Sequence, residues 1–178
     1  MASVKVDAEK LFEKARAAGE LDAVEDNLFN FCRLFQSNYE FRRLVREVSV
    51  PVSDRVKAIL EIRCFKPSSV FRTVLILILQ GKNLERTMIF QELFTKIADE
   101  KLNRKTIQVI SSVPLPDSMA RKIQEDCGRI LKSNVHIRHL LDETLIAGLV
   151  IKLPDGKIFD FSLKKQLAEY KSFVMEKE

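Results

Sequence analysis

The chain has 178 residues, of which 46% are hydrophobic and 31% are charged, and its formal net charge is +5. This balance is typical of a folded globular protein with one medium domain or two small ones, and it excludes a chain that is disordered over most of its length. Acidic residues are interleaved with basic ones in both halves, whereas nucleic-acid-binding proteins more often concentrate basic residues on one stripe or arm.

The rarer residue types exclude further classes of protein. The five glycines are scattered singly, so no glycine-rich loop is available to cradle a phosphate group. Cys32, Cys64 and Cys127 form no CxxC pair, and we expect three reduced thiols in a cytosolic protein. The most apolar run, Val74–Leu79, is far shorter than the roughly 20 residues that span a bilayer, and the N-terminus has no apolar stretch of signal-peptide length. We therefore expect a soluble protein.

Helical periodicity begins near the N-terminus and continues through the first hundred residues. A first helix, which ends near Gly19, has a short apolar face formed by Leu11, Phe12 and Ala15. A second helix is predicted from a stripe with spacings of three and four residues, formed by Leu21, Val24, Leu28, Phe31 and Phe35. Both patterns indicate helices that pack one face on a core.

Two shorter helices are predicted next. The third helix covers Tyr39–Val48, and its inward side is formed by Phe41, Leu44, Val45 and Val48. Pro51 ends it, and Ser53 or Asp54 can cap a fourth helix. The inward residues of that helix are Val56, Ile59, Leu60 and Ile62.

The fifth predicted helix is the most apolar segment of the chain. Its β-branched residues also allow a strand, but the start at Ser68 and Ser69 and the stop at Gly81 favour a helix that is almost wholly buried. Asn83 then caps a sixth helix that runs to about Asn103, through Leu84, Met88, Ile89, Leu93, Ile97 and Leu102. Six helices with short connections predict an all-α bundle over residues 1–104.

The pattern changes after Arg104, and residues 105–178 predict a small α+β domain. Alternating residues predict strands at Ile107–Ser112, Val135–Leu141, Gly148–Leu153 and Lys157–Phe161. The last two are joined by Pro154-Asp155-Gly156, a sequence typical of a β-hairpin turn. Asp117 caps a helix whose predicted buried side is Met119, Ile123, Cys127, Ile130 and Leu131, and Ser162 caps a final helix from Leu163 to about Met175. The chain as a whole is therefore predicted to be α+β.

The segment from Leu141 to Ser162 resembles the C-terminal motif of the ATP synthase delta subunit family, which includes the mitochondrial oligomycin-sensitivity-conferring protein. The matching positions are Asp142, Leu145, Ile146, Gly148, Asp160 and Ser162. Within this segment, three positions depart from the family pattern, namely Glu143, Ala147 and Phe161, and in the first helix Asp7-Ala8 stands in place of the family's Tyr-Ala. Shorter segments also resemble the family in the same order, at residues 10–13, 81–84 and 109–116. The resemblance covers essentially the whole chain.

The resemblance implies a stator subunit without catalytic activity, held at the cytoplasmic face of a bacterial inner membrane or an equivalent organelle membrane. The helical half would bind the N-terminal helix of an alpha subunit, and the C-terminal half would bind the b-type helices of the peripheral stalk. No cofactor is implied. One alternative is an adaptor that binds other helices in the same way. The other is an RNA-binding all-α module such as a transcription antitermination factor. Binding to RNA phosphates would weaken steeply with added salt, whereas binding in an apolar groove would change little.

The residues themselves predict no catalytic or metal site. No GxxxxGK[ST] motif is present. His136 and His139 would point to opposite faces of a strand, so they make a poor metal-binding pair. Asp142 and Glu143 are adjacent in an extended chain, where side chains diverge, so we expect turn-making rather than acid–base chemistry.

We expect the partner-binding groove of the helical half to lie between the first and fifth helices. The reason is that these helices carry more apolar residues than a small bundle needs to pack its core. The candidate groove residues are Leu11, Phe12, Ala15, Val74 and Ile78. The alternative is that all five are ordinary core residues. On the groove hypothesis, replacing Ala15 with Glu should abolish binding of the partner helix.

Overall fold

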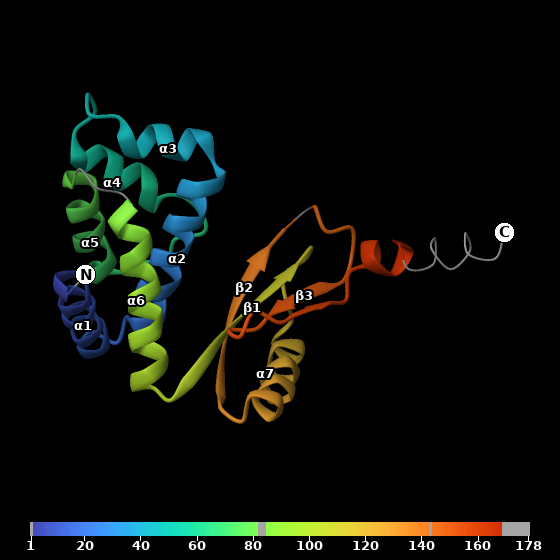
Figure 1. Cartoon of the computed structure of the whole chain (residues 1–178). Coiled ribbons are helices and arrows are strands. Elements are labelled where there is room, and N and C mark those ends of the chain that lie inside the picture. Colours follow the sequence, from blue (N-terminus) through green and yellow to red (C-terminus); the bar gives the residue numbers. More distant parts are fainter. Residues whose placement is uncertain (1, 82–84, 143, 169–178) are drawn as a thin grey trace, which may run out of the picture. The chain divides into compact units, whose positions relative to one another are not determined.

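The protein is α+β and divides into two compact units, Met1–Ala98 and Asp99–Glu178 (Figure 1). This computed structural model describes residues 2–81, 85–142 and 144–168. Within that part of the chain, no helix is both long and apolar enough to cross a membrane. The coarse class agrees with the sequence prediction.

Within its described residues, the first unit is built from α-helices alone. The helices are α1 (Ala2–Ala17), α2 (Leu21–Ser37), α3 (Tyr39–Arg46), α4 (Val52–Leu60), α5 (Ser69–Gln80) and α6 (Glu85–Lys101), whose last three residues fall in the second unit. Gly19 has a φ of +67° and ends α1 through a left-handed turn, as its position in the sequence predicts. Ser68 is the N-cap of α5, because its Oγ accepts a hydrogen bond of 3.0 Å from the backbone N–H of Phe71.

Phenylalanine fills much of the core of the helical unit. Phe12, Phe31, Phe71 and Phe94 are almost completely buried. The ring of Phe65 stacks on that of Phe71 at a centroid distance of 5.7 Å, while the rings of Phe31 and Phe41 meet edge to face at 5.4 Å. Aromatic side chains bury a large area each, so this cluster supplies a major part of the hydrophobic stabilisation of the unit.

Two predictions for α3 and α4 are wrong. The helix α3 ends at Arg46, and Val48, which was expected on its buried side, is 86% exposed. The helix α4 begins directly after Pro51, the residue at its N-cap, so Ser53 and Asp54 lie inside its first turn and do not cap it. Proline is well suited to a helix start because it has a fixed φ and no N–H to satisfy.

The buried faces of α5 and α6 also differ from the prediction. Only Phe71, Leu75 and Leu79 are buried in α5, and Leu77 is 64% exposed, so the helix is not almost wholly buried. In α6 the exposed Ile89 was predicted to face inward, whereas the fully buried Phe94 and Ala98 were missed. The predicted cap of α6, Asn83, lies outside the described residues.

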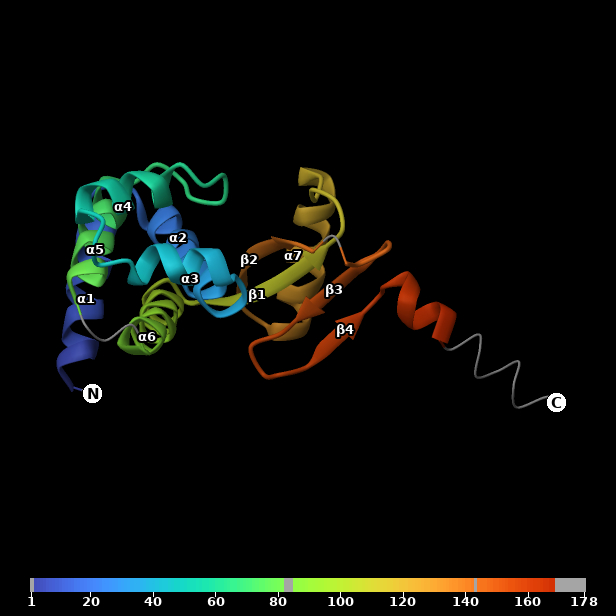
Figure 2. The same ribbon diagram turned by 90° about the horizontal axis from the view of Figure 1, so that it is seen from above.

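The second unit packs one helix on a four-stranded mixed sheet. Its elements are β1 (Arg104–Ser111), α7 (Asp117–Leu131), β2 (Asn134–Leu141), β3 (Leu149–Lys152) and β4 (Ile158–Asp160). The sheet order is β2-β1-β3-β4, with β1 and β2 parallel and the other pairs antiparallel. A parallel pair needs a crossover connection, and α7 provides it (Figure 2). Residues 163–168 are helical, and the remainder of the predicted final helix lies outside the described residues.

The core of the second unit lies between α7 and one face of the sheet. Ile107 and Val109 of β1 and Ile151 of β3 pack there against Ile123 and Cys127 of α7. Met119 and Ile130, which were predicted to be buried, are 46% and 61% exposed, so the inward stripe of α7 is narrower than expected. Asp117 is the first residue of α7 and lies next to Pro116, the N-cap residue, so its predicted capping role is wrong.

Candidate functional site

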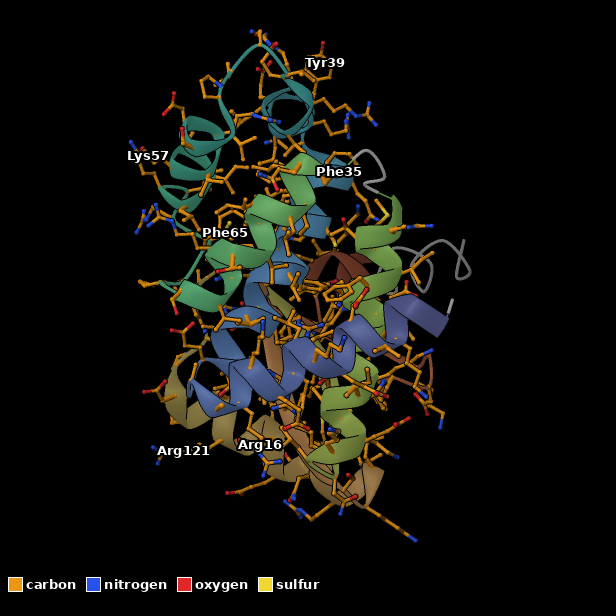
Figure 3. The ribbon with its side chains drawn as sticks, turned by 90° about the vertical axis from the view of Figure 1, so that its left-hand side faces the viewer. Arg16, Phe35, Tyr39, Lys57, Phe65 and Arg121 are labelled. Carbon is orange, nitrogen blue, oxygen red and sulfur yellow. The ribbon has the colours of Figure 1, made fainter. Side chains whose placement is uncertain are left out.

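An open groove of about 620 Å³ lies between α1 and α5 in the helical unit, with residues at the start of α6 also lining it. Figure 3 views the unit from the side on which α1, α5 and α6 lie, with Arg16 labelled at the C-terminal end of α1. The apolar residues of the lining are Leu11, Val70, Val74, Leu77, Ile78 and Phe90. The groove is therefore an apolar trough between helices, of the kind that receives an amphipathic helix.

Three of the five predicted groove residues line this trough. Leu11 comes from α1, and Val74 and Ile78 come from α5. Phe12 and Ala15 are completely buried and do not line it, so they are core residues of α1 and not groove residues. A Glu at position 15 would therefore place a charge in the core, and such a variant would test the fold rather than the groove.

The helix α5 is apolar on two faces, which is why it can pack on the core and line the groove at once. Phe71, Leu75 and Leu79 recur every four residues on the buried face. Val74 and Leu77 lie on the other face, and Leu77 is the most exposed apolar residue of the groove. Sequence reasoning missed Leu77 because it expected the helix to be almost wholly buried and named only Val74 and Ile78 of this run as groove candidates.

A single carboxylate joins the turn after α1 to the first turn of α5. Glu20 accepts hydrogen bonds from the hydroxyl of Ser68 at 2.6 Å, the hydroxyl of Ser69 at 2.9 Å and the backbone N–H of Val70 at 3.1 Å. These bonds, led by that from Ser68, lower the pKa of Glu20 from 4.5 to about 2. Because α1 and α5 form the two walls of the groove, Glu20 fixes their separation at this end.

The most suggestive pair of polar side chains in the second unit does not form an activated nucleophile. Ser111 Oγ lies 2.7 Å from His139 Nε2 and donates a hydrogen bond of 2.6 Å to the carbonyl of Val113. A hydroxyl has one hydrogen, so Nε2 must itself donate to Oγ and cannot accept the serine proton. Burial also lowers the pKa of His139.

The three cysteines are poorly suited to nucleophilic chemistry. Burial raises the pKa of Cys32 to about 12 and raises the pKa values of Cys64 and Cys127. The thiolate is the reactive form, so thiols with raised pKa values are largely inert at neutral pH.

The C-terminal motif residues form turns after β2 and after β4. Asp142 accepts hydrogen bonds from the backbone N–H and the hydroxyl of Thr144, which makes a tight turn after β2. Asp160 accepts a bond of 2.8 Å from the N–H of Ser162, and the bonds from Ser162 lower the pKa of Asp160. Ser162 is buried and its Oγ accepts from the N–H of Lys165, so it caps the following helix, as predicted.

Gly148 is required by a close approach of two backbone segments. Its φ is +93°, and a Cβ there would overlap the carbonyl oxygen of Phe161 and lie 2.9 Å from the Cα of Ser162. The two segments are joined by hydrogen bonds from the N–H of Phe161 to Leu149 and from the N–H of Leu163 to Ala147. The departures at Ala147 and Phe161 thus leave the backbone pairing in place, while Glu143 lies outside the described residues.

Exposed apolar side chains gather on these adjacent segments. We call Ile146, Phe161, Leu163 and Leu167 the C-terminal patch, and all four are exposed. Leu163 and Leu167 are four residues apart and share one face of the helix that follows β4. Leu145 of the motif is half-buried beside the patch. Contiguous exposed apolar side chains are typical of a surface that another protein covers.

Known proteins resemble this chain over nearly its whole length. A family model described as ATP synthase delta (OSCP) subunit matches residues 8–173. The chain is 25% identical over 171 residues to the ATP synthase subunit delta of Acetivibrio thermocellus, which covers 96% of each protein. It is 24% identical over 160 residues to that of Natranaerobius thermophilus, with 90% of this chain and 88% of the relative covered. A chain in the cryo-EM structure of the Toxoplasma gondii mitochondrial ATP synthase hexamer is similar over 97% of both chains, with 15% identity and a TM-score of 0.45.

Proposed function

The chain belongs to the ATP synthase delta (OSCP) subunit family and is a peripheral-stalk subunit, and from this premise we propose that its two units connect the catalytic head to the stalk. The helical part, residues 1–104, binds the N-terminal helix of an alpha subunit. The part at residues 105–178 binds the b-type helices. The protein is not a catalyst in this arrangement, and it lies at the cytoplasmic face of the membrane as a peripheral subunit.

The second apolar face of α5 is the observation that carries the proposal for the head. Leu77 is 64% exposed in a groove whose other apolar residues come from α1, α5 and α6. Covering the exposed part of such a leucine stabilises a complex by roughly 1–2 kcal/mol. An amphipathic helix laid between α1 and α5 would bury this face and several of its neighbours together.

The C-terminal patch is the proposed contact for the stalk. Its residues lie on the hairpin end and on the helix that follows it, where Leu163 and Leu167 form an apolar stripe. An apolar stripe of this spacing is suited to packing along another helix. A joint of this kind must resist torque for long periods, so a slow dissociation rate matters more than a fast association rate.

Calorimetric titration with a peptide of the alpha-subunit N-terminal helix tests the groove. We expect Leu77→Gln to weaken binding about tenfold or more, because it removes an exposed apolar contact while keeping a residue that favours helix. Val48→Gln is the matched control, since Val48 is an exposed aliphatic residue of the same unit that does not line the groove. Equal affinities for the two variants would contradict the assignment of the groove. Absence of binding to the folded wild-type protein would contradict the proposed partner.

A further inference from the structure

The α1 wall of the groove carries an ordered row of charges. Asp7, Lys10 and Lys14 all line the groove and are exposed. Their spacing of three and four residues places them on one face of α1, with Leu11 between them. The α5 wall contributes only uncharged residues to the lining. The charged residues of the lining therefore lie on α1, with the addition of Arg86 on α6.

These three side chains are not engaged elsewhere in the described part of the protein. Their side chains have neither a hydrogen-bond partner nor an ion-pair partner within residues 2–81, 85–142 and 144–168. Some other surface charges of the same unit are paired, as in the contact of 2.6 Å between Lys66 and Asp26. The row therefore remains available to a bound segment.

We propose that Asp7, Lys10 and Lys14 set the register and direction of the helix bound in the groove. This inference rests on the proposed function. The occupant carries two acidic residues four positions apart, opposite Lys14 and Lys10, followed by a basic residue opposite Asp7. Four helical residues span about 6 Å on either helix, so the acidic pair matches the spacing of the lysine pair.

The order of charges selects a helix that runs antiparallel to α1. Acidic residues stabilise the N-terminal turns of a helix and basic residues stabilise its C-terminal turns. A helix with its acidic end against Lys14 and its basic end against Asp7 satisfies this preference. The two helix dipoles are then also opposed, which is the favourable arrangement for neighbouring helices. In the reverse direction the same helix would place like charges together at Asp7 and at Lys14.

We expect the charge row to determine which helix binds and in which direction, while the apolar contacts supply most of the affinity. Exposed ion pairs are individually weak, and together these pairs amount to roughly a tenfold preference at low salt. The apolar face of α5 keeps the helix bound at high salt, where screening reduces the preference to a small factor.

Two peptides and three proteins test the proposal by calorimetric titration at low and high salt. Both peptides carry the same apolar face, that of the alpha-subunit N-terminal helix. One has flanking charges in the order acidic, acidic, basic. The other has the sign of each charge inverted, which gives the order basic, basic, acidic. The proteins are the wild type, a charge-inverted variant (Asp7→Lys, Lys10→Glu, Lys14→Glu) and a control (Lys5→Glu, Arg16→Glu). The control residues are exposed on α1 and do not line the groove.

We expect the wild type and the control to prefer the first peptide about tenfold, and the charge-inverted variant to prefer the second by a similar factor. Circular dichroism checks that each variant is folded. Equal affinities of every protein for both peptides would overturn the role of the charge row and leave the groove intact. A failure of both peptides to bind any of the folded proteins would overturn the proposed function itself.

Discussion

At the residue scale, Glu20 shows how one side chain can connect the two walls of a groove that it does not itself line. It accepts hydrogen bonds from Ser68, Ser69 and Val70, at the first turn of α5 and 48 to 50 residues away in sequence. The favourable interaction of a carboxylate with a helix N-terminus adds to these bonds. No local sequence pattern indicates such a contact, because it depends on how α1 and α5 meet.

The pKa of Glu20 makes part of the stability of the helical unit dependent on pH. The folded-state pKa of about 2 lies below the usual 4.5, so the stabilisation is complete above pH 4.5 and is lost as the pH falls toward 2. We expect Glu20→Gln to be less stable than the wild type at pH 7, with a difference that shrinks between pH 4.5 and pH 2. Denaturant unfolding at several pH values measures this.

Glu61→Gln is the control for that series. Glu61 is an exposed glutamate of the same unit, and its carboxylate has no partner within the residues that the structure describes. A stability difference between the wild type and Glu20→Gln that stays constant from pH 7 to pH 3 would show that the charge of Glu20 is not responsible.

At the element scale, the β3–β4 hairpin depends on a glycine for two separate reasons. Gly148→Ala introduces both a positive φ at a non-glycine residue and an overlap with the backbone of Phe161. We expect a loss of about 2–4 kcal/mol in the free energy of unfolding. Gly156→Ala, where φ is +84° and no atom lies near the added Cβ, should cost only about 1–2 kcal/mol. Thermal unfolding of the two variants measures the difference, and equal losses would contradict the close approach.

The ends of α5 were easier to predict from the sequence than its buried face. Ser68 and Gly81 bracket α5 as predicted, because capping residues act locally. The run between them is apolar at nearly every position, so periodicity could not tell that Leu77 faces outward. In α7 the apolar Met119 and Ile130 were mistaken for core residues for a related reason, since a single sheet face covers only a narrow stripe.

The candidate site could be predicted only in part. Leu11, Val74 and Ile78 line the groove, and the reasoning from surplus apolar residues named them. The same reasoning also named Phe12 and Ala15, which are core residues. A surplus of apolar residues in a helix does not reveal which of them face the core and which face the groove. Gly148 was recognised through a family resemblance, but its contact with Phe161 became evident only in three dimensions.

At the scale of the whole molecule, the proposed contacts for the head and the stalk lie in different compact units. We expect Leu77→Gln to weaken binding of the alpha-subunit helix and to leave binding of a b-type C-terminal segment unchanged. Leu167→Gln should have the opposite effect, because it alters only the C-terminal patch. Substitutions at sites that share no contacts or partners act independently. Titration of each variant with each partner checks this, and a single variant that weakens both would show that the units are coupled.

The second apolar face of α5 also bears on how much of this protein a cell can make. A copy without its partner leaves Leu77 and the neighbouring stripe in contact with water, and uncovered stripes of this kind promote self-association. On the proposed function, synthesis beyond the supply of partner helices would therefore yield copies prone to aggregation and open to chaperones and proteases. On the proposed function, the same face would tie the dosage of this chain to that of the helix bound in the groove.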